Sequence, residues 1–370
     1  MRRVFAALLA IALLLAGCGN QKVDPDAKIG SSNEKREKYE YVFYNTFDTV
    51  ISFVAYMNSQ KAFDEQAAFV ESEFQRLHKI FDNYQNYDGV SNVKTLNDNA
   101  GKDPIVVDKE LIDLIQLSRD YTKKYSDKTN IALGAVLGIW HQYREEGLAN
   151  PQEAKIPTLE ELNEAAQHVN LNDVKIDSKK STVQLVDPLM SLDLGAVAKG
   201  YATELVAKAL LERGVDSAIV SAGGNVRTIG QPKDGLRNRW GIGIQNPDNA
   251  MGKSGEQTIE VLYVKGTSVV TSGDYQRYYT VDGKTYHHLI DPVEKMPMTY
   301  FRSVSVVTED SGLADFLSTA AFLMPFEESK KFIEGLDGVE AIWILNDNTI
   351  TATENLKKEM RSEGATSKDE

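Results

Sequence analysis

The chain has 370 residues, enough for about two domains of ordinary size and for a large buried core. Its 41 Lys and Arg against 54 Asp and Glu give a net charge of -13, which excludes a protein that wraps nucleic acid with a broad basic surface. One cysteine excludes an intramolecular disulfide and a Cys-x-x-Cys metal site, and with only five histidines a bound metal is expected to have oxygen ligands.

The N-terminal segment has the pattern of an export signal. Two arginines precede an apolar run, residues 4–15, that is shorter than the about 20 residues of a membrane-spanning helix. Residues 1–17 are therefore predicted to be a signal peptide, and the Leu-Ala-Gly before Cys18 is similar to a bacterial lipobox. A lipid on Cys18 would anchor the protein to the outer face of the cytoplasmic membrane, whereas a plain signal peptide that happens to contain a cysteine is the alternative. Residues 18–39 are predicted to be a flexible tether.

The folded body is predicted at residues 40–356, followed by a polar tail at 357–370. Apolar and β-branched runs predict strands at 49–56, 183–186, 217–221, 240–244, 259–264, 304–307, 341–345 and 349–353. Helical spacing of apolar residues predicts helices at 63–81, 109–125, 198–213, 312–323 and 326–334. A capping box at 158–161 starts one more helix, and residues 82–101 are predicted to be a loop. Because strands and helices mix without strict alternation, we predict an α+β fold with mixed, largely antiparallel sheets and packed helices.

Two glycine-containing segments could approach a ligand closely. Residues 193–202 end a strand pattern at Asp193 and open a helix whose first turn carries Lys199, so free N–H groups and a cation could bind an anion there. An ordinary turn with Asp193 as the N-cap is the alternative. Residues 222–225 (Ala-Gly-Gly-Asn) are too short for a phosphate loop and favour a turn.

Two further segments carry hydroxyls, imidazoles and carboxylates. Residues 271–275 and 286–292 could bind an ion or relay a proton, and of the two adjacent histidines we expect only His288 to enter a site, since neighbours on a strand point to opposite faces. Asp315 and Thr319 are spaced i, i+4 and share one face of an apolar helix. With a backbone carbonyl they suit Mg²⁺; a capping Asp315 and a Thr319 bonded to its own helix are the alternative.

Taken in chain order, these segments resemble the ApbE family of FAD:protein FMN transferases. The family pattern reads approximately D-[LF]-G-x-x-A-K-G-Y-A, A-G-G-[DN], T-S-G-x-[YF], H-x-[IL]-[DN]-P and A-D-x-[LM]-[SA]-T-A, and this chain matches it at 193–202, 222–225, 271–275, 288–292 and 314–320. The likeness extends over about residues 41–355. One departure is visible: the family usually continues Asp-Pro with x-Thr-Gly, whereas Val-Glu-Lys stands at 293–295 here.

The resemblance implies an enzyme that moves FMN from FAD to a Thr or Ser hydroxyl of a partner flavoprotein and releases AMP. It implies Mg²⁺ held by Asp315, Thr319 and the carbonyl of Ala196, with His288 as the general base acting through Asp291. The residues that it implies for FAD binding are Tyr84 or Tyr87 as a ring stacker, Lys128, Thr129, Asn130, Asp193, Lys199, Ser272 and Gly273.

The implied partners are exported or membrane flavoproteins, and no nucleic acid is expected. Two other activities fit the same residues. One is a metal-dependent FAD pyrophosphatase, in which water replaces the acceptor hydroxyl and the products are FMN and AMP. The other is a lipid-anchored protein that binds FAD without reaction, although a binder has no need of Mg²⁺ at the pyrophosphate.

Overall fold

The computed structural model describes residues 35–249 and 256–368, so the predicted signal peptide and the lipobox with Cys18 lie outside the described residues. The first strand, β1, begins at Glu37 rather than after a tether that ends at residue 39. The alternating Tyr39, Tyr41 and Phe43 of β1 pack their rings on the core.

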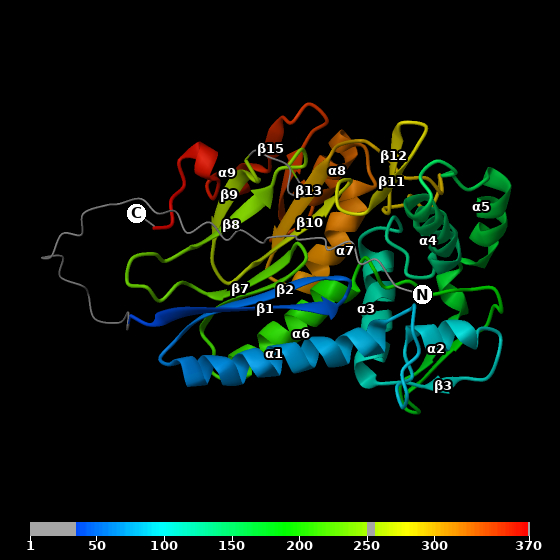
Figure 1. The fold of residues 1–370 in the computed structure, drawn as a ribbon, viewed down its shortest axis with the longest axis horizontal. Helices are drawn as coiled ribbons and strands as arrows, with labels where there is room; N and C mark the ends of the chain where they lie inside the picture. The colour runs from blue at the N-terminus through cyan, green and yellow to red at the C-terminus, as the bar shows by residue number, and fades with distance from the viewer. Residues whose placement is uncertain (1–34, 250–255, 369–370) are drawn as a thin grey trace, which may run out of the picture.

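The largest sheet of the described chain has eight strands in the order β1-β2-β6-β7-β10-β13-β14-β15 (Figure 1). Every neighbouring pair is antiparallel, which confirms the predicted α+β class with antiparallel sheets. The strands are β1 (Glu37–Thr46), β2 (Thr49–Met57), β6 (Ser217–Ala222), β7 (Asn225–Gly230), β10 (Ser268–Gly273), β13 (Ser303–Thr308), β14 (Glu340–Ile344) and β15 (Ile350–Ala352).

Three short sheets accompany the large one. They are β3 (Ile105–Val106) with β5 (Thr182–Leu185) and β4 (Val174–Asp177), the ribbon of β8 (Trp240–Gln245) and β9 (Thr258–Val264), and the hairpin of β11 (Tyr278–Val281) and β12 (Lys284–His287). The helices are α1 (Gln60–Phe81), α2 (Val93–Asp98), α3 (Lys109–Lys124), α4 (Gly134–Ala149), α5 (Leu159–Ala165), α6 (Ala198–Glu212), α7 (Ser311–Phe322), α8 (Phe326–Glu334) and α9 (Glu354–Lys357).

The large sheet is covered on both faces. α1 and α6 run along one side of it, and the β8–β9 ribbon lies on the other (Figure 1). Alternation along β2 follows this layering: Phe53 points into the cluster with α1, whereas Val54 points into the cluster with β8 and β9. A third cluster joins α4 and α5 to the β11–β12 hairpin. No helix of the described residues is long and apolar enough to cross a membrane.

Two expectations about the chain's ends and loops are wrong. The segment 82–101, expected to be a loop, contains α2, which a capping box at Asn92 and Thr95 starts. The expected polar tail after residue 356 is packed: Met360 is buried beside β9 and forms a bridge with Leu262. Burial of the apolar Met360 side chain therefore holds this otherwise polar segment against the fold.

Candidate active site

The centre of the site is the close contact between α6 and α7. A Cβ at Gly200 would lie 2.3 Å from the carbonyl oxygen of Ser311 and 2.5 Å from the Cβ of Asp315, so only glycine allows this approach. The N–H of Gly200 donates to Oδ2 of Asp315 at 2.8 Å instead of to the carbonyl of Ala196 four residues earlier. Among the hydrogen bonds of the described residues, none ends on that Ala196 carbonyl oxygen, which is left available.

Hydroxyl groups from α7 and β10 line the same pocket. Oγ of Ser272 lies 2.9 Å from Oγ of Ser318 and 3.4 Å from Oγ1 of Thr319. Ser318 Oγ also donates to the carbonyl of Asp315 on its own helix at 3.0 Å. Because β10 is a central strand and α7 packs on it, Ser272 and Thr319 are both buried yet face one another.

The Gly-Gly segment is a tight hairpin turn between β6 and β7, as the sequence favoured. Gly223 and Gly224 have φ of 54° and 102°, and a Cβ at Gly223 would clash with Thr49. The turn places Asn225 at the start of β7, paired with Val270 of β10. Asn225 is buried, and its side-chain amide lies near enough to Asp315 to act as a donor that lowers the pKa of that carboxyl.

Asp315 is 4% exposed and its electrostatic surroundings are mixed. Burial raises the pKa of Asp315, while the Lys199 ammonium, the Gly200 N–H and the Asn225 amide oppose the increase. No group of three or more His, Cys, Asp and Glu gathers as a metal site in residues 35–249 and 256–368. One carboxylate, the Thr319 hydroxyl and the free carbonyl of Ala196 are hard oxygen donors, and such a set fits a Mg²⁺ ion that also binds substrate phosphates.

His288 stands on the loop that follows β12, beside the carbonyl of Arg277. Its Nδ1 lies 3.2 Å from that oxygen, and because a carbonyl can only accept, the hydrogen bond needs the proton on Nδ1 and leaves a lone pair on Nε2. Although part of the ring is exposed, desolvation is the largest cause that holds the pKa of His288 well below its ordinary value, followed by the positive charge of Arg277. Lys199 and Arg144 add to this effect.

The neighbouring His287 has a different environment. It is buried, donates from Nε2 to the carbonyl of Met298 at 2.7 Å and accepts at Nδ1 from the N–H of Leu289 at 3.2 Å. Both nitrogens of His287 are therefore used within the fold. The two histidines point to different surroundings, as expected for neighbours at a strand end.

Asp291, which the resemblance implies to act with His288, contacts Lys128 and two backbone N–H groups. Asp291 accepts from Nζ of Lys128 at 2.6 Å and from the backbone N–H groups of Val293 and Glu294. Burial alone would raise the pKa of Asp291, but these donors lower it below its ordinary value. Asp291 and Lys128 thus hold the loop after His288 to the loop before α4.

The other implied FAD-binding side chains fall into two groups. Thr129 is buried and donates to the carbonyl of Phe316 at 3.3 Å. The side chain of Asn130 accepts from the N–H of Ala132 and donates to the carbonyl of Val169, so both residues make hydrogen bonds within the fold.

The second group, Asp193 and Lys199, lies just before and in the first turn of α6 and is partly exposed. Asp193 accepts from Gly195 N–H and from the Asn83 amide, and Lys199 donates to the carbonyl of Gly195 at 3.1 Å. Asp193 is not the N-cap of α6, because the helix begins only at Ala198. Gly273 admits the ring of Tyr275, whose Cε1 would lie 2.7 Å from a Cβ there.

Tyr84 and Tyr87 differ in what they contact. The hydroxyl of Tyr87 donates to Asp82 at 2.6 Å, whereas Tyr84 is 48% exposed and its ring centroid lies 4.8 Å from that of His141. Burial of the hydroxyl and the charge of Asp193 raise the pKa of Tyr84 to about 12. The arrangement favours Tyr84 as the ring that a planar ligand would contact.

Three residues without an assigned role in the sequence also belong to this rim. Arg144 lies 2.6 Å from Nδ1 of His141, one turn earlier on α4. Arg277 reaches the carbonyls of Phe47 and Asp48 at 3.4 and 3.3 Å, and both of these turn residues have positive φ. His141 and Arg144 lie on α4, outside the segments that the sequence analysis singled out. Only Arg277, two residues after Tyr275, is close to one of those segments.

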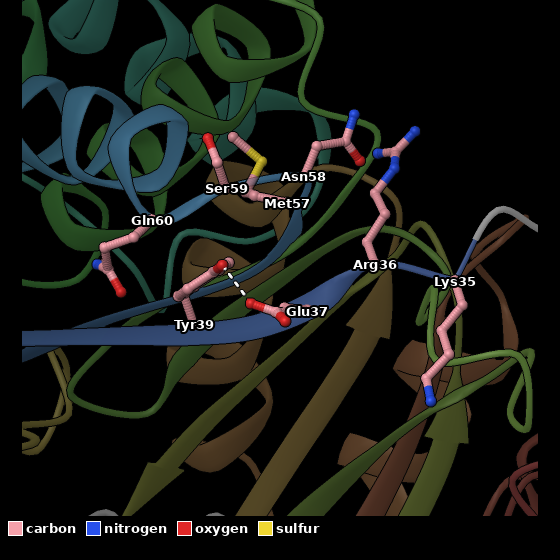
Figure 2. A pocket seen from close by; sticks show the side chains of 8 residues that line it. All are labelled: Lys35, Arg36, Glu37, Tyr39, Met57, Asn58, Ser59 and Gln60. Carbon is pink, nitrogen blue, oxygen red and sulfur yellow. Dashed lines mark hydrogen bonds between the residues drawn. The ribbon is translucent and has the colours of Figure 1, made fainter.

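A surface groove lies elsewhere. About 630 Å³ in volume, it is found at the ends of β1 and β2 that are farthest from the β6–β7 turn (Figure 2). It is lined by Lys35, Arg36, Glu37, Tyr39, Met57, Asn58, Ser59 and Gln60. The groove shares no residue with the α6–α7 pocket and is not part of the candidate site.

Known proteins share both the sequence and the fold. A model of the ApbE family matches residues 47–343. The FAD:protein FMN transferase of Treponema pallidum is 33% identical over 283 residues, which cover 73% of this chain and 75% of that protein. One from Klebsiella pneumoniae is 29% identical and covers 78% and 86%. The chain therefore belongs to the ApbE family.

Solved structures agree with this assignment. The crystal structure of the ApbE protein from Thermotoga maritima superposes with a TM-score of 0.74 at 30% identity, over 87% of this chain and 99% of that one. The apo form of the flavinyl transferase ApbE from Pseudomonas stutzeri, at 23% identity, has a TM-score of 0.71 over 90% and 99%. The second likeness concerns the fold alone.

Proposed function

We propose that this protein transfers FMN from FAD to a Thr or Ser hydroxyl of a partner flavoprotein, with Mg²⁺ as cofactor and AMP as the second product. The observation that carries the proposal is the oxygen set of the α6–α7 pocket, namely the carboxylate of Asp315, the Thr319 hydroxyl and the unbonded carbonyl of Ala196. The family relatives named FAD:protein FMN transferase support the reaction class.

In this reaction the acceptor oxygen forms a bond to the phosphorus of the FMN half, and the bond from that phosphorus to the bridging oxygen of AMP breaks. When bound by Asp315, Thr319 and the Ala196 carbonyl, Mg²⁺ would neutralise charge on the pyrophosphate. The ammonium of Lys199, in the first turn of α6, adds positive potential near Asp315. Most of the catalysis is therefore positioning and charge stabilisation, as phosphoryl transfer requires.

Proton transfer from the acceptor hydroxyl is assigned to Nε2 of His288. The hydrogen bond to the carbonyl of Arg277 keeps the proton on Nδ1, and the lowered pKa keeps the imidazole neutral at pH 7. Nε2 can then accept the hydroxyl proton as the new bond forms. The imidazolium of His288 then gives this proton to water before the next turnover.

We further propose that the protein works at the outer face of the cytoplasmic membrane, anchored through a lipid on Cys18, and that its partners are exported or membrane flavoproteins. The support is the export signal and the lipobox of the sequence. Metabolic labelling with a radioactive fatty acid tests this part: the wild-type protein should carry label, and Cys18→Ser should not.

The activity is tested by incubating the protein with FAD, Mg²⁺ and an exported flavoprotein, followed by mass spectrometry of the acceptor. A mass increase equal to one FMN phosphoester, with AMP released in equal amount, is expected. FMN and AMP formed at the same rate without any acceptor would replace the transferase by a pyrophosphatase. FAD that stays bound and intact with Mg²⁺ would leave only a binding protein.

A further inference from the structure

Two hydrogen bonds of opposite direction join the helices that form the candidate site. The N–H of Gly200 on α6 donates to Oδ2 of Asp315 on α7 at 2.8 Å. In return, the N–H of Ser311 on α7 donates to Oε2 of Glu204 on α6 at 2.9 Å. On each helix the donor and the acceptor are four residues apart and share one face. Each helix thus supplies one carboxylate and one N–H to the other.

Both N–H groups belong to the first turn of their helix, where no carbonyl of the same helix can accept from them. The N-cap of α7 does not serve Ser311, because Asp310 accepts from the N–H of Leu313 instead. Gly200 and Ser311 are also buried, so water does not readily replace either carboxylate. Each helix start is therefore capped by the other helix. We call Gly200, Asp315, Ser311 and Glu204 together the reciprocal cap.

Arg227 on β7 holds the Glu204 half of the reciprocal cap. Its Nε donates to Oε2 of Glu204 at 3.0 Å, the same oxygen that accepts from Ser311. Glu204 and Arg227 are 4% and 7% exposed, so burying either charge without the other would be costly. A second cation, the exposed Lys208, reaches the other oxygen, Oε1, at 3.5 Å. The oxygen that caps α7 is therefore fixed by Arg227 and not by Lys208.

We propose that Glu204 and Arg227 are positioning residues, which act through the reciprocal cap to hold α7 against α6 and so to orient Asp315. Two hydrogen bonds about 6 Å apart along each helix fix both the spacing and the register of the pair, whereas one bond would let the helices pivot. The inference rests on the function proposed above, because it concerns the carboxylate assigned to the metal.

Amide hydrogen exchange of the metal-free wild-type protein, followed residue by residue by NMR, tests the reciprocal cap directly. If the two bonds form one unit, the N–H groups of Gly200 and Ser311 open together, with equal opening free energies and equal dependence on urea. A Ser311 N–H that exchanges like an unprotected amide, or that opens independently of Gly200, would overturn the proposal. This measurement needs no variant and no ligand.

Arg227→Gln and Lys208→Gln are a matched pair, because each removes one cation from the same carboxylate. Arg227→Gln should speed exchange of the Gly200 amide at least about tenfold, since Glu204 loses the cation that offsets its burial. It should also raise the Kd for Mn²⁺ in the FAD complex about tenfold. Lys208→Gln should leave both quantities unchanged, as exposed ion pairs contribute little. Equal effects of the two variants would refute the role of Arg227.

The Kd is measured by electron paramagnetic resonance of free Mn²⁺, corrected for Mn²⁺ bound by FAD alone. Ser329→Ala is the control for lost stability: it removes the buried acceptor of the Trp343 indole and should lower the melting temperature without changing the Kd. Glu204→Gln keeps an oxygen for the Ser311 N–H and should lie between the wild type and Glu204→Ala in both measurements. A Ser329→Ala effect as large as that of Arg227→Gln would reduce the pair to a merely structural role.

Failure of the function proposed above has a different signature. If Mn²⁺ binds neither to the free protein nor to the FAD complex of the wild type, the metal assignment is wrong. Joint opening of the Gly200 and Ser311 amides would still establish the reciprocal cap in that case, since exchange is measured without metal.

Discussion

The α6–α7 pocket and the rim around Tyr84 are built in opposite ways. The pocket is buried and consists of residues on regular elements, such as Asp315 and Thr319 on α7 and Ser272 on β10. The rim is partly exposed and collects side chains from loops and a helix face, including Tyr84, His141 and Arg277. A buried site on rigid elements holds its geometry without a ligand, whereas an exposed rim can adjust to one. Substitutions in the pocket are therefore expected to abolish activity, whereas substitutions in the rim are expected to reduce it in part.

The largest effect is expected from Asp315→Asn. The amide oxygen can still accept from the Gly200 N–H, but it lacks the charge that holds the metal, so AMP release should fall by about 10³-fold or more. The melting temperature should stay the same or rise, because a buried charge has been removed. Mg²⁺-dependent turnover at the wild-type rate would contradict the metal assignment.

Next in size is the loss of His288. His288→Ala should slow transfer by about 10²–10⁴-fold with little change in the Kd for FAD, because a general base acts in the transition state. His287→Ala is the matched control: it removes two internal hydrogen bonds and should cost about 2 kcal/mol of stability while the folded fraction keeps its rate. If the two variants exchange these phenotypes, the base has been assigned to the wrong histidine.

A smaller effect, confined to the rim, is expected on the Kd for FAD, and it distinguishes Tyr84 from Tyr87. Tyr84→Ala should raise the Kd for FAD about tenfold through the lost ring contact, as measured by fluorescence quenching of the flavin. Tyr87→Phe should leave that Kd unchanged and lower the free energy of unfolding by about 1 kcal/mol, since it breaks the hydrogen bond to Asp82. The reverse pattern would make Tyr87 the stacking residue.

The smallest effect concerns pH. Only the neutral form of His288 can accept a proton, so the rate should fall as pH drops through its pKa, and the lowered pKa places that fall well below pH 6.5. Arg277→Gln keeps the backbone carbonyl but removes a nearby positive charge, which should raise the pKa of His288 and move the acidic limb to higher pH. A pH–rate profile of transfer that does not move would show that the Arg277 charge does not act on the base.

The same contrast explains what could be predicted from the sequence. The i, i+4 spacing of Asp315 and Thr319 places both residues on one face of α7, where both are buried. The antiparallel α+β fold followed from strand and helix patterns of local origin. The spacing of residues along one helix or strand determines which side chains share a face of that element. Much of the pocket depends on such spacing.

Contacts between distant segments could not be predicted in this way. Lys128 and Asp291 are 163 positions apart, and nothing in either segment indicates that they pair with each other rather than with a ligand. The carbonyl of Arg277 that orients His288 is a backbone atom, which leaves no trace in residue type. The Ala196 carbonyl, in contrast, was implied by the resemblance, and the structure adds the reason it is unbonded: Asp315 has taken the N–H that would have bonded to it.

The packed C-terminal segment has a consequence for how the chain matures. Leu262 of the β8–β9 ribbon forms its bridge with Met360, almost a hundred residues after β9, and Glu260 accepts from the N–H of Ser362. This contact can therefore form only after β10 to β15 have been synthesised. A chain that ends before Met360 would leave Leu262 without this contact.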